Sequence, residues 1–317
     1  MMKFVVCNEQ SYPSLNVHLT KMENITLWKK AGEKTSEVLN FARKLAKPET
    51  PLLEIAEKTE EYAAKQKLRF AFPINICCDN LAAHYCPSLG DKTPARGLLK
   101  IDLGIAIEGF SGDAAITIDL TPEQKHSDII KANQKALDKA INLIKEDPEV
   151  KISQIGKAIN AEISGLGFST VKNLSGHEIT PWLLHAGLTI PNYDNGNQNA
   201  LGEGIFAIEP FATYGEGFVK DWKPSNILML KEKRPVRGKA HEVLKFIESE
   251  YRTLPFASRW ILNRFGRNAL LSLSQLEKQG ILHHFPQLIE RSGKEVSQFE
   301  HTLAIVDRKA IVLTEGD

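Results

Sequence analysis

Cysteine is scarce in this sequence, and long hydrophobic runs are missing from it. The four cysteines, Cys7, Cys77, Cys78 and Cys86, are too few and too clustered for the disulfide framework of a secreted protein. No apolar run approaches the roughly 20 residues that a membrane-spanning helix needs. The apolar stretch at the start of the chain is also too short for a signal-peptide core. These absences predict a protein of the reducing cytoplasm.

An excess of charge of either sign is also missing. Lysine and arginine together number 40, and aspartate and glutamate together number 39. Balanced charge gives no bulk attraction to nucleic acid or to an anionic membrane, which disfavours polyanion binding as the main activity. A chain of 317 residues with 42% hydrophobic residues can form one large α/β domain, or a core domain with a smaller insertion.

Helical periodicity begins only after the first twenty or so residues. Residues 1–21 lack a clear pattern and are predicted to be an atypical N-terminal extension, with Met22 as an alternative start. From Ile25 the apolar spacing predicts a helix that ends before Pro48. A second helix is predicted for residues 52–67, followed by a short extended segment, 69–78, which Pro73 interrupts.

The same order of elements recurs about a hundred residues later. Two helical patterns, 126–147 and 151–167, precede an extended segment at 168–179. This long-period similarity predicts two related halves folded around a shared cleft. Thr121-Pro122, with Gln124 after them, fits a capping pattern and predicts a helix that begins at Thr121.

Two further regions complete the predicted organisation. Residues 98–120 contain two β-rich runs about a turn near Glu108-Gly109, which is typical of a hairpin. Residues 240–292 show helical patterns with no strand between them, and we predict an inserted helical subdomain at 236–295. The remaining parts, 22–235 and 296–317, form the predicted core domain, which residues 310–313 close.

Asp102 and Asp113 lie on the two arms of the predicted hairpin. Folding about residues 107–108 would place these two carboxylates directly opposite each other. Adjacent carboxylates inside apolar runs repel and cost stability, so a compensating cation is expected. The alternative is that either aspartate is a solvated turn or edge residue.

Three more residues have the chemistry of metal ligands. Strand alternation places Phe206 and Ile208 on one face and Glu209 on the other, Glu300 adjoins another apolar run, and His177 follows a small-residue turn. A lone glutamate in a strand usually faces solvent. Four carboxylates and one imidazole together, however, suit a pair of Mn²⁺, Fe²⁺, Co²⁺ or Zn²⁺ ions. Such a pair lowers the pKa of water, which predicts a hydrolase.

Five separated segments resemble the motifs of methionine aminopeptidases, in their order and approximate spacing. They are AFPINICCDNLAAHY, KIDLGIAIEGFSGDAA, NLSGHEITPWLLHAG, FAIEPFAT and QFEHT. The resemblance runs from about Ile25 to Val312, and the predicted insertion resembles the one that separates type 2 enzymes from type 1. It implies an archaeal-like type 2 member of peptidase family M24. The implied pita-bread α/β (α+β) fold has pseudo-twofold halves, an antiparallel-rich curved sheet covered by helices, and a winged-helix-like inserted subdomain.

The resemblance also implies roles for individual residues. The implied ligands of two divalent ions (Co, Mn, Fe, Zn or Ni) are Asp102, Asp113, His177, Glu209 and Glu300. The implied catalytic residues are Glu209, which takes a proton from water, and His84 and His185, which contact the scissile amide and the carbonyl oxygen. The implied substrate pocket contains Phe72, Leu184 and Phe285 beside the two histidines. Taken alone, each histidine also fits a satisfied core residue.

Two residues depart from the family pattern. Phe285 stands where many relatives carry tyrosine, and Glu178 stands where small or polar residues are usual. A zinc knuckle built from Cys77, Cys78, His84 and Cys86 is disfavoured, because adjacent cysteines make a poor tetrahedral pair.

The implied activity is removal of the N-terminal methionine from nascent polypeptides whose second residue is small. The expected partners are these polypeptides, with the ribosome as a candidate docking partner. Direct contact with nucleic acid or a membrane is not expected, and the expected state is a monomer. Two alternatives stay open. One is a peptidase like aminopeptidase P or prolidase, which usually carries a large N-terminal domain. The other is a non-catalytic pita-bread protein that binds partners or RNA.

Overall fold

The computed structural model describes residues 21–315, so the predicted extension lies outside the described residues except for Lys21. The first half contains helices α1 (Lys21–Leu45) and α2 (Leu52–Lys65) and strands β1 (Arg69–Cys78), β2 (Leu81–Ala83), β3 (Leu98–Ile107), β4 (Phe110–Ser111) and β5 (Ala114–Asp119). The second half contains α3 (Ser127–Glu146), α4 (Ile152–Gly165), β6 (Ser169–Thr170), β7 (Ser175–Glu178), β8 (Thr189–Pro191), β9 (Gly204–Ile208) and β10 (Phe211–Thr213). The predicted repeat of two helices followed by strands is confirmed.

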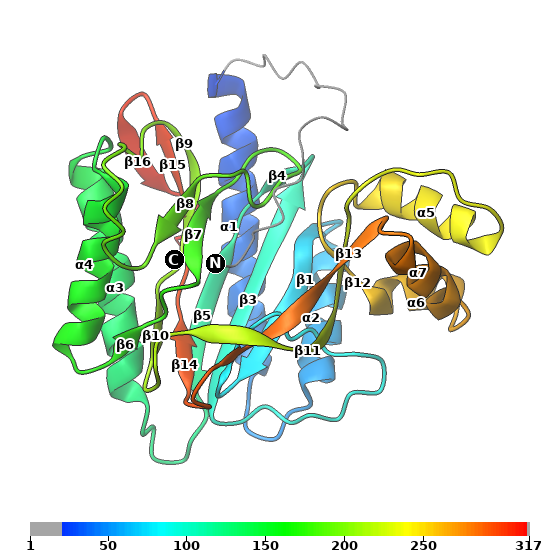
Figure 1. Cartoon of the computed structure of the whole chain (residues 1–317), viewed down its shortest axis with the longest axis horizontal. Helices are drawn as coiled ribbons and strands as arrows, with labels where there is room; N and C mark the ends of the chain where they lie inside the picture. The colour runs from blue at the N-terminus through cyan, green and yellow to red at the C-terminus, as the bar shows by residue number, and fades with distance from the viewer. Residues whose placement is uncertain (1–20, 316–317) are drawn as a thin grey trace.

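Two antiparallel sheets form the centre of the molecule. The first joins β1, β3, β4 and β5, and the second has the order β16-β15-β9-β7-β8. Strands β15 (His301–Val306) and β16 (Lys309–Val312), which come last in the chain, form one edge of this second sheet, so the predicted closing strand is present. Helices α1 and α2 cover one sheet and α3 and α4 cover the other (Figure 1). The mixed α/β class predicted from the sequence is confirmed.

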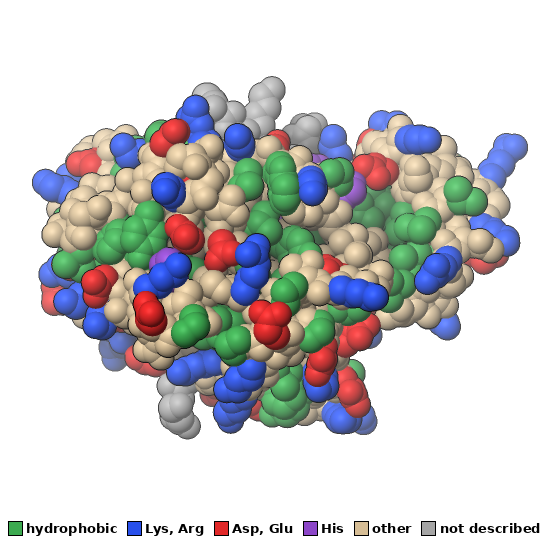
Figure 2. All heavy atoms as spheres, turned by 90° about the horizontal axis from the view of Figure 1, so that it is seen from below, with side chains coloured by type: hydrophobic (Ala, Val, Ile, Leu, Met, Phe, Trp, Pro, Cys, Tyr) green, Lys and Arg blue, Asp and Glu red, His purple; other side chains and the backbone are tan. Residues whose placement is uncertain are grey.

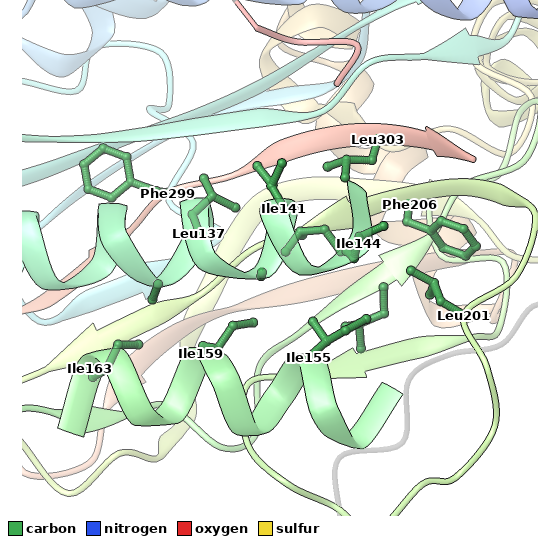
Figure 3. Close-up of a cluster of buried hydrophobic side chains, with 14 of the residues drawn as sticks. Leu137, Ile141, Ile144, Ile155, Ile159, Ile163, Leu201, Phe206, Phe299 and Leu303 are labelled. Atoms are coloured by element: carbon green, nitrogen blue, oxygen red, sulfur yellow. The ribbon is translucent and has the colours of Figure 1, made fainter. Parts of the chain in front are cut away.

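Each helix pair buries an apolar stripe against its sheet. On α3 the buried residues Leu137, Ile141 and Ile144 recur at helical spacing and meet Ile155 and Ile159 of α4 (Figure 3). Phe206 and Leu303 lie in the same cluster, and they come from β9 and β15. This packing turns one face of the second sheet toward the helices and leaves the other face for the site.

The predicted turn near Glu108-Gly109 is confirmed, but the strands pair about these two residues, one position later than the centre at 107–108 assumed for the two aspartates. Glu108 and Gly109 both have positive φ, 54° and 92°, as a two-residue type I′ turn requires. Asp102 therefore pairs with Ala115 rather than with Asp113. The prediction that the two aspartates lie directly opposite each other is wrong, because the turn centre fixes the register.

The predicted helix start at Thr121 is also wrong. The helix α3 begins at Ser127, and residues 121–126 form turns. Gln124 has a φ of 47°, which a right-handed helix does not allow. The Asp119 carboxylate accepts hydrogen bonds from the backbone N–H groups of Thr121 (2.9 Å) and His126 (2.6 Å) and so stabilises the turn instead.

The predicted inserted segment has its own hydrophobic cluster. It contains α5 (Lys239–Glu250), β12 (Phe256–Ala257), α6 (Ser258–Phe265), α7 (Ala269–Lys278) and β13 (Leu282–Glu290). The prediction of no strand in this stretch is wrong, because β12 and β13 pair with β11 (Val219–Leu230), and β13 also pairs with β2. Apolar residues of the three helices pack together beside these strands, and Figure 1 places the helices at one end of the molecule. The short strand β14 (Val296–Gln298) leads back to the centre.

Charged side chains of both signs are interspersed on one face of the molecule (Figure 2). On the face in Figure 2, lysines and arginines lie among aspartates and glutamates rather than in a patch of one sign. Within the described part of the chain, no helix combines the length and apolar character that crossing a membrane requires.

Candidate metal centre and active site

Asp102 and Asp113 lie on the same face of the first sheet. Asp102 is paired with Ala115 in the β3–β5 ladder, and Asp113 precedes Ala115 by two residues, which places it diagonally across from Asp102. Thr302 fixes the backbone of Asp113: its hydroxyl accepts the Asp113 N–H at 2.8 Å and donates to the Asp113 carbonyl at 2.7 Å. The two carboxylates are therefore neighbours, although the register predicted for them is wrong.

His177 and Glu209 come from the second sheet. His177 in β7 is paired with Ala207 in β9. Glu209 follows Ala207 by two residues, so its side chain lies on the same face as that of Ala207. The Nε2 atom of His177 lies 3.5 Å from Glu209 Oε1 and 3.7 Å from Asp113 Oδ2. The predicted alternation in β9 is correct, since Phe206 and Ile208 point into the helical core.

Glu300 completes the group at the junction of the two sheets. It forms a backbone bridge with Ala115, which places its side chain beside the first sheet. One ligand atom each from Asp113, His177 and Glu300 lie within 4.8 Å of one another, and all three residues are buried. Of the five residues predicted as metal ligands, Asp102 lies in β3 and His177 in β7, whereas Asp113, Glu209 and Glu300 lie directly beside strand ends near this junction.

Gln298 is a site residue that sequence reasoning missed. Its side-chain amide lies 3.2 Å from Asp102 Oδ2 and 3.2 Å from Glu300 Oε2, and donates to both. A hydrogen bond to two carboxylates fixes their orientation, as the outer partners of metal ligands do. The signal was its position two residues before Glu300, which places both side chains on one face of an extended chain.

Burial and mutual repulsion raise the carboxyl pKa values of the group. Burial raises the pKa of Asp102 to about 7. It also raises the pKa of Asp113, with the Asp102 charge as second cause, and the pKa values of Glu209 and Glu300, with the Asp113 charge as second cause. Burial lowers the pKa of His177 to about 4. Without a cation, several of these carboxylates cannot be charged together at neutral pH.

These residues fit divalent cations. The Oδ1 atoms of Asp102 and Asp113 are buried and receive no hydrogen bond from the described residues. Carboxylate oxygens with one imidazole nitrogen are ligands that Mn²⁺, Fe²⁺, Co²⁺ and Zn²⁺ accept. A cation would offset both the repulsion and the unpaired oxygens. Among residues 21–315, the candidate group of three or more ligand residues consists of Asp113, His177 and Glu300.

His84 lies directly after β2, and its backbone has a φ of 65°. Its Nδ1 atom lies 2.9 Å from the carbonyl oxygen of Pro286. Because a carbonyl only accepts hydrogen bonds, Nδ1 carries the proton and Nε2 offers a lone pair. Burial lowers the pKa of His84, so the ring is neutral at neutral pH.

His185 lies at the solvent-accessible edge of the group. Its ring centroid is 4.3 Å from that of His177. The residue is exposed to solvent, with protein on its other sides. Desolvation by these surroundings, with His177 as second cause, lowers the pKa of His185 well below its usual value. An exposed ring beside a buried histidine is placed to meet a ligand from solvent.

The three apolar residues predicted for the pocket fall into two clusters. Phe72 and Leu184 are buried in one cluster. Phe285 packs beside Cys86 and Ile227 in another, and its ring lies 5.4 Å from that of His84. Phe285 belongs to strand β13 rather than to the helices of the inserted segment.

The sequence has close relatives among known proteins. The family model for metallopeptidase family M24 matches residues 26–251. The methionine aminopeptidase of Pyrococcus abyssi is 42% identical over 291 residues, which cover 90% of this chain and 97% of the relative. The methionine aminopeptidase of Pyrococcus horikoshii is 42% identical over 290 residues, with the same coverage.

Solved structures with low sequence identity share the fold. A thermophilic Arx1 gives a TM-score of 0.79 at 15% identity, covering 93% of this chain and 91% of that chain. The methionine aminopeptidase of Thermotoga maritima gives a TM-score of 0.63 at 21% identity, covering 92% of this chain and 97% of that chain. Prolidase of Pyrococcus furiosus gives 0.59 at 18% identity and covers 93% of this chain but 64% of the prolidase. With the family match over most of its length and these relatives, the chain belongs to metallopeptidase family M24.

Proposed function

We propose that this protein is a methionine aminopeptidase that removes the N-terminal methionine from polypeptides whose second residue is small. The observation that carries the proposal is the convergence of Asp113, His177 and Glu300 within 4.8 Å, with Asp102 and Glu209 beside them. The 42% identity to relatives named methionine aminopeptidase supports the choice of substrate.

Two divalent ions would be held by the five predicted ligands, Asp102, Asp113, His177, Glu209 and Glu300. When bound, such ions supply Lewis acidity, which lowers the pKa of water and polarises a carbonyl oxygen. The contribution of the chain is to fix the ligands: Gln298 orients Asp102 and Glu300, and Thr302 holds the backbone of Asp113.

Glu209 is the proposed proton acceptor. It lies at the partly exposed end of the carboxylate group, 3.5 Å from His177 Nε2, and its pKa is raised by burial. A carboxylate at this position can accept a proton from the attacking water. The same oxygen can then return this proton to the departing amino group.

The two outer histidines are the proposed substrate contacts. His84 directs its protonated Nδ1 to Pro286, so its Nε2 can accept the N–H of the scissile amide. His185 is neutral at neutral pH and can donate one ring N–H to the substrate carbonyl oxygen, on which charge develops. The two residues thus act on opposite ends of the peptide bond.

Phe72, Leu184 and Phe285 are the proposed wall of the methionine pocket. Phe285 packs against His84, Leu184 directly precedes His185, and Phe72 shares the buried cluster of Leu184. An unbranched thioether side chain fits an irregular apolar site. We assign the chain to type 2 because of the inserted segment, 236–295, between the parts 22–235 and 296–317 of the catalytic domain. The effects of Phe285 and Glu178 on specificity belong to the same proposal.

The proposed setting is the cytoplasm, where nascent polypeptides are the substrates and the ribosome is a candidate docking partner. Cys77, Cys78 and Cys86 are free and buried, which agrees with a reducing compartment. We propose a monomer, because each ligand of the group comes from this one chain.

The test is release of methionine by the purified protein with Mn²⁺ or Co²⁺ added. We expect cleavage of Met-Ala-led and Met-Gly-led peptides and little cleavage of Met-Leu-led ones. Preference for peptides with proline in second position would favour a prolidase-like or aminopeptidase P-like activity. Absence of release with several metals, in protein verified as folded, would contradict the proposal.

A further inference from the structure

The segment between β7 and β8 carries Leu184 and His185 outside any regular strand. Its base is closed by hydrogen bonds from the Glu178 N–H to the Leu188 carbonyl (3.0 Å) and from the Ala186 N–H to the Glu178 carbonyl (2.9 Å). Closer to the tip, Thr180 and Leu183 exchange two backbone hydrogen bonds of 2.9 Å. These bonds define the loop but leave its tip residue, Trp182, to contacts from elsewhere.

Trp182 has a backbone conformation that needs external support. Its φ is 65°, in the left-handed region that bulky residues rarely adopt. Such a conformation is unfavourable for a bulky side chain and persists where the surrounding structure holds it. Because Trp182 is three residues before His185, its placement sets the path of the chain toward that histidine.

One support comes from the β3–β4 hairpin. The Trp182 N–H donates to the Gly109 carbonyl at 2.8 Å. The indole lies so close to this turn that a Cβ atom at Gly109 would be 2.2 Å from Trp182 Nε1. The hairpin that contributes Asp102 thus also holds one side of Trp182.

The other support comes from the inserted segment. The Thr253 hydroxyl donates a hydrogen bond to the Trp182 carbonyl, and the guanidinium carbon of Arg252 lies 4.2 Å from the centroid of the Trp182 ring. Leu254 is buried in the same cluster as Leu184. Three consecutive residues after α5 therefore contact the loop that carries His185.

The inserted segment is itself fixed to the first half of the chain. The buried guanidinium of Arg259 donates to the two carboxylate oxygens of Glu60 at 2.5 and 2.8 Å, and its Nε donates to the Pro87 carbonyl at 3.2 Å. Thr253 therefore belongs to a segment that Arg259 fixes to the first half of the chain.

We propose that Thr253 is a positioning residue for His185, which it reaches through Trp182, so that the inserted segment sets the geometry of one substrate-contacting histidine. This inference rests on the proposed function for its kinetic consequence. Thr253 and Trp182 touch no proposed metal ligand in the described contacts, so metal binding should not depend on them.

The kinetic test compares Thr253→Val with Thr253→Ser in methionine release. Valine keeps the shape of threonine but cannot donate, and we expect kcat to fall about tenfold with KM changed less than twofold, since a small misplacement of a substrate-contacting group costs rate. Serine keeps the hydroxyl and should restore kcat to within about twofold. Arg252→Gln, which removes the cation from the indole, is a second variant with an expected smaller loss.

Thr59→Val is the matched control. It also removes a threonine hydroxyl that donates to a backbone carbonyl, here that of Ile55 at 2.7 Å within α2, away from the His185 loop. We expect its kcat to equal that of the wild type at a temperature where both are folded. A kcat for Thr253→Val no lower than that of Thr59→Val would overturn the proposal.

A measurement without turnover separates this inference from the proposed function. The ring signals of His185 in the metal-free protein can be assigned by their loss in His185→Ala. These signals should shift in Thr253→Val and stay in place in Thr59→Val. Unchanged signals in Thr253→Val would overturn the positioning role. If the wild type releases no methionine, the proposed function fails and the ring signals alone decide this inference.

Discussion

Ala115 and Glu300 exchange backbone hydrogen bonds across the junction of the two central sheets. The Glu300 N–H donates to the Ala115 carbonyl at 3.0 Å, and the Ala115 N–H donates to the Glu300 carbonyl at 3.4 Å. Ala115 is also the ladder partner of Asp102. One short bridge therefore sets the distance between ligands of the first half and of the second half, so the site depends on how the halves join.

Glu209→Gln should abolish turnover while the protein stays folded. The amide has nearly the shape of the carboxylate but cannot accept the proton of the attacking water, so we expect kcat to fall by about 10³-fold. Methionine release and circular dichroism measure the two effects. Glu146→Gln is the control at the exposed end of α3 and should keep full activity. A Glu209→Gln protein with near wild-type turnover would remove Glu209 from its proposed role.

Gln298→Leu should weaken metal binding by about 10- to 100-fold, because Asp102 and Glu300 lose the donor that orients them. Competition titration with a metal chelator gives the affinity. Gln66→Leu is a matched control, since Gln66 also donates its amide to a carboxylate, that of Glu37 at 2.7 Å, in the interface of α1 and α2. Equal affinities for the two variants would argue against a role of Gln298 at the site.

Arg259→Met should destabilise the protein by about 3–5 kcal/mol, because the carboxylate of Glu60 loses its buried partner. Urea unfolding measures the free energy. The exposed pair of Lys58 and Glu54, at 2.6 Å, provides the comparison, and Lys58→Met should cost less than about 1 kcal/mol. Similar losses in both variants would show that burial does not distinguish these pairs.

The lowered pKa of Glu37 predicts a contribution to folding stability that is lost in acid. Hydrogen bonds from Lys34 and then Tyr62 lower the pKa of Glu37 to about 2, from 4.5. A carboxyl with a lowered folded-state pKa stabilises the protein above its unfolded pKa, and this contribution is lost as pH falls from about 4.5 toward 2. The stability difference between wild type and Glu37→Gln should therefore be constant above pH 5 and shrink below pH 4. A difference that does not change with pH over this range would contradict the assignment.

Local patterns in the sequence determined most of the elements and the faces of the strands. Apolar spacing placed the helices that became α1 to α4, because a buried stripe at helical period is a property of the segment itself. Alternation in β9 placed Glu209 opposite Phe206 and Ile208 for the same reason. The chemistry of five ligand-type side chains, with the resemblance of five motifs, pointed to a metallopeptidase before any contact was known.

Only the tertiary structure decided the register of the β3–β5 hairpin, the junction of the two central sheets and the contacts that hold Trp182. Positive φ at two successive turn residues moved the pairing of Asp102 to Ala115, and the Asp119 carboxylate replaced the predicted helix at Thr121 by a turn. The contact of Gln298 with Asp102 joins residues almost two hundred positions apart. The support of Trp182 by Thr253 is equally non-local. Such contacts depend on how separate elements pack, and no pattern within a single segment encodes that.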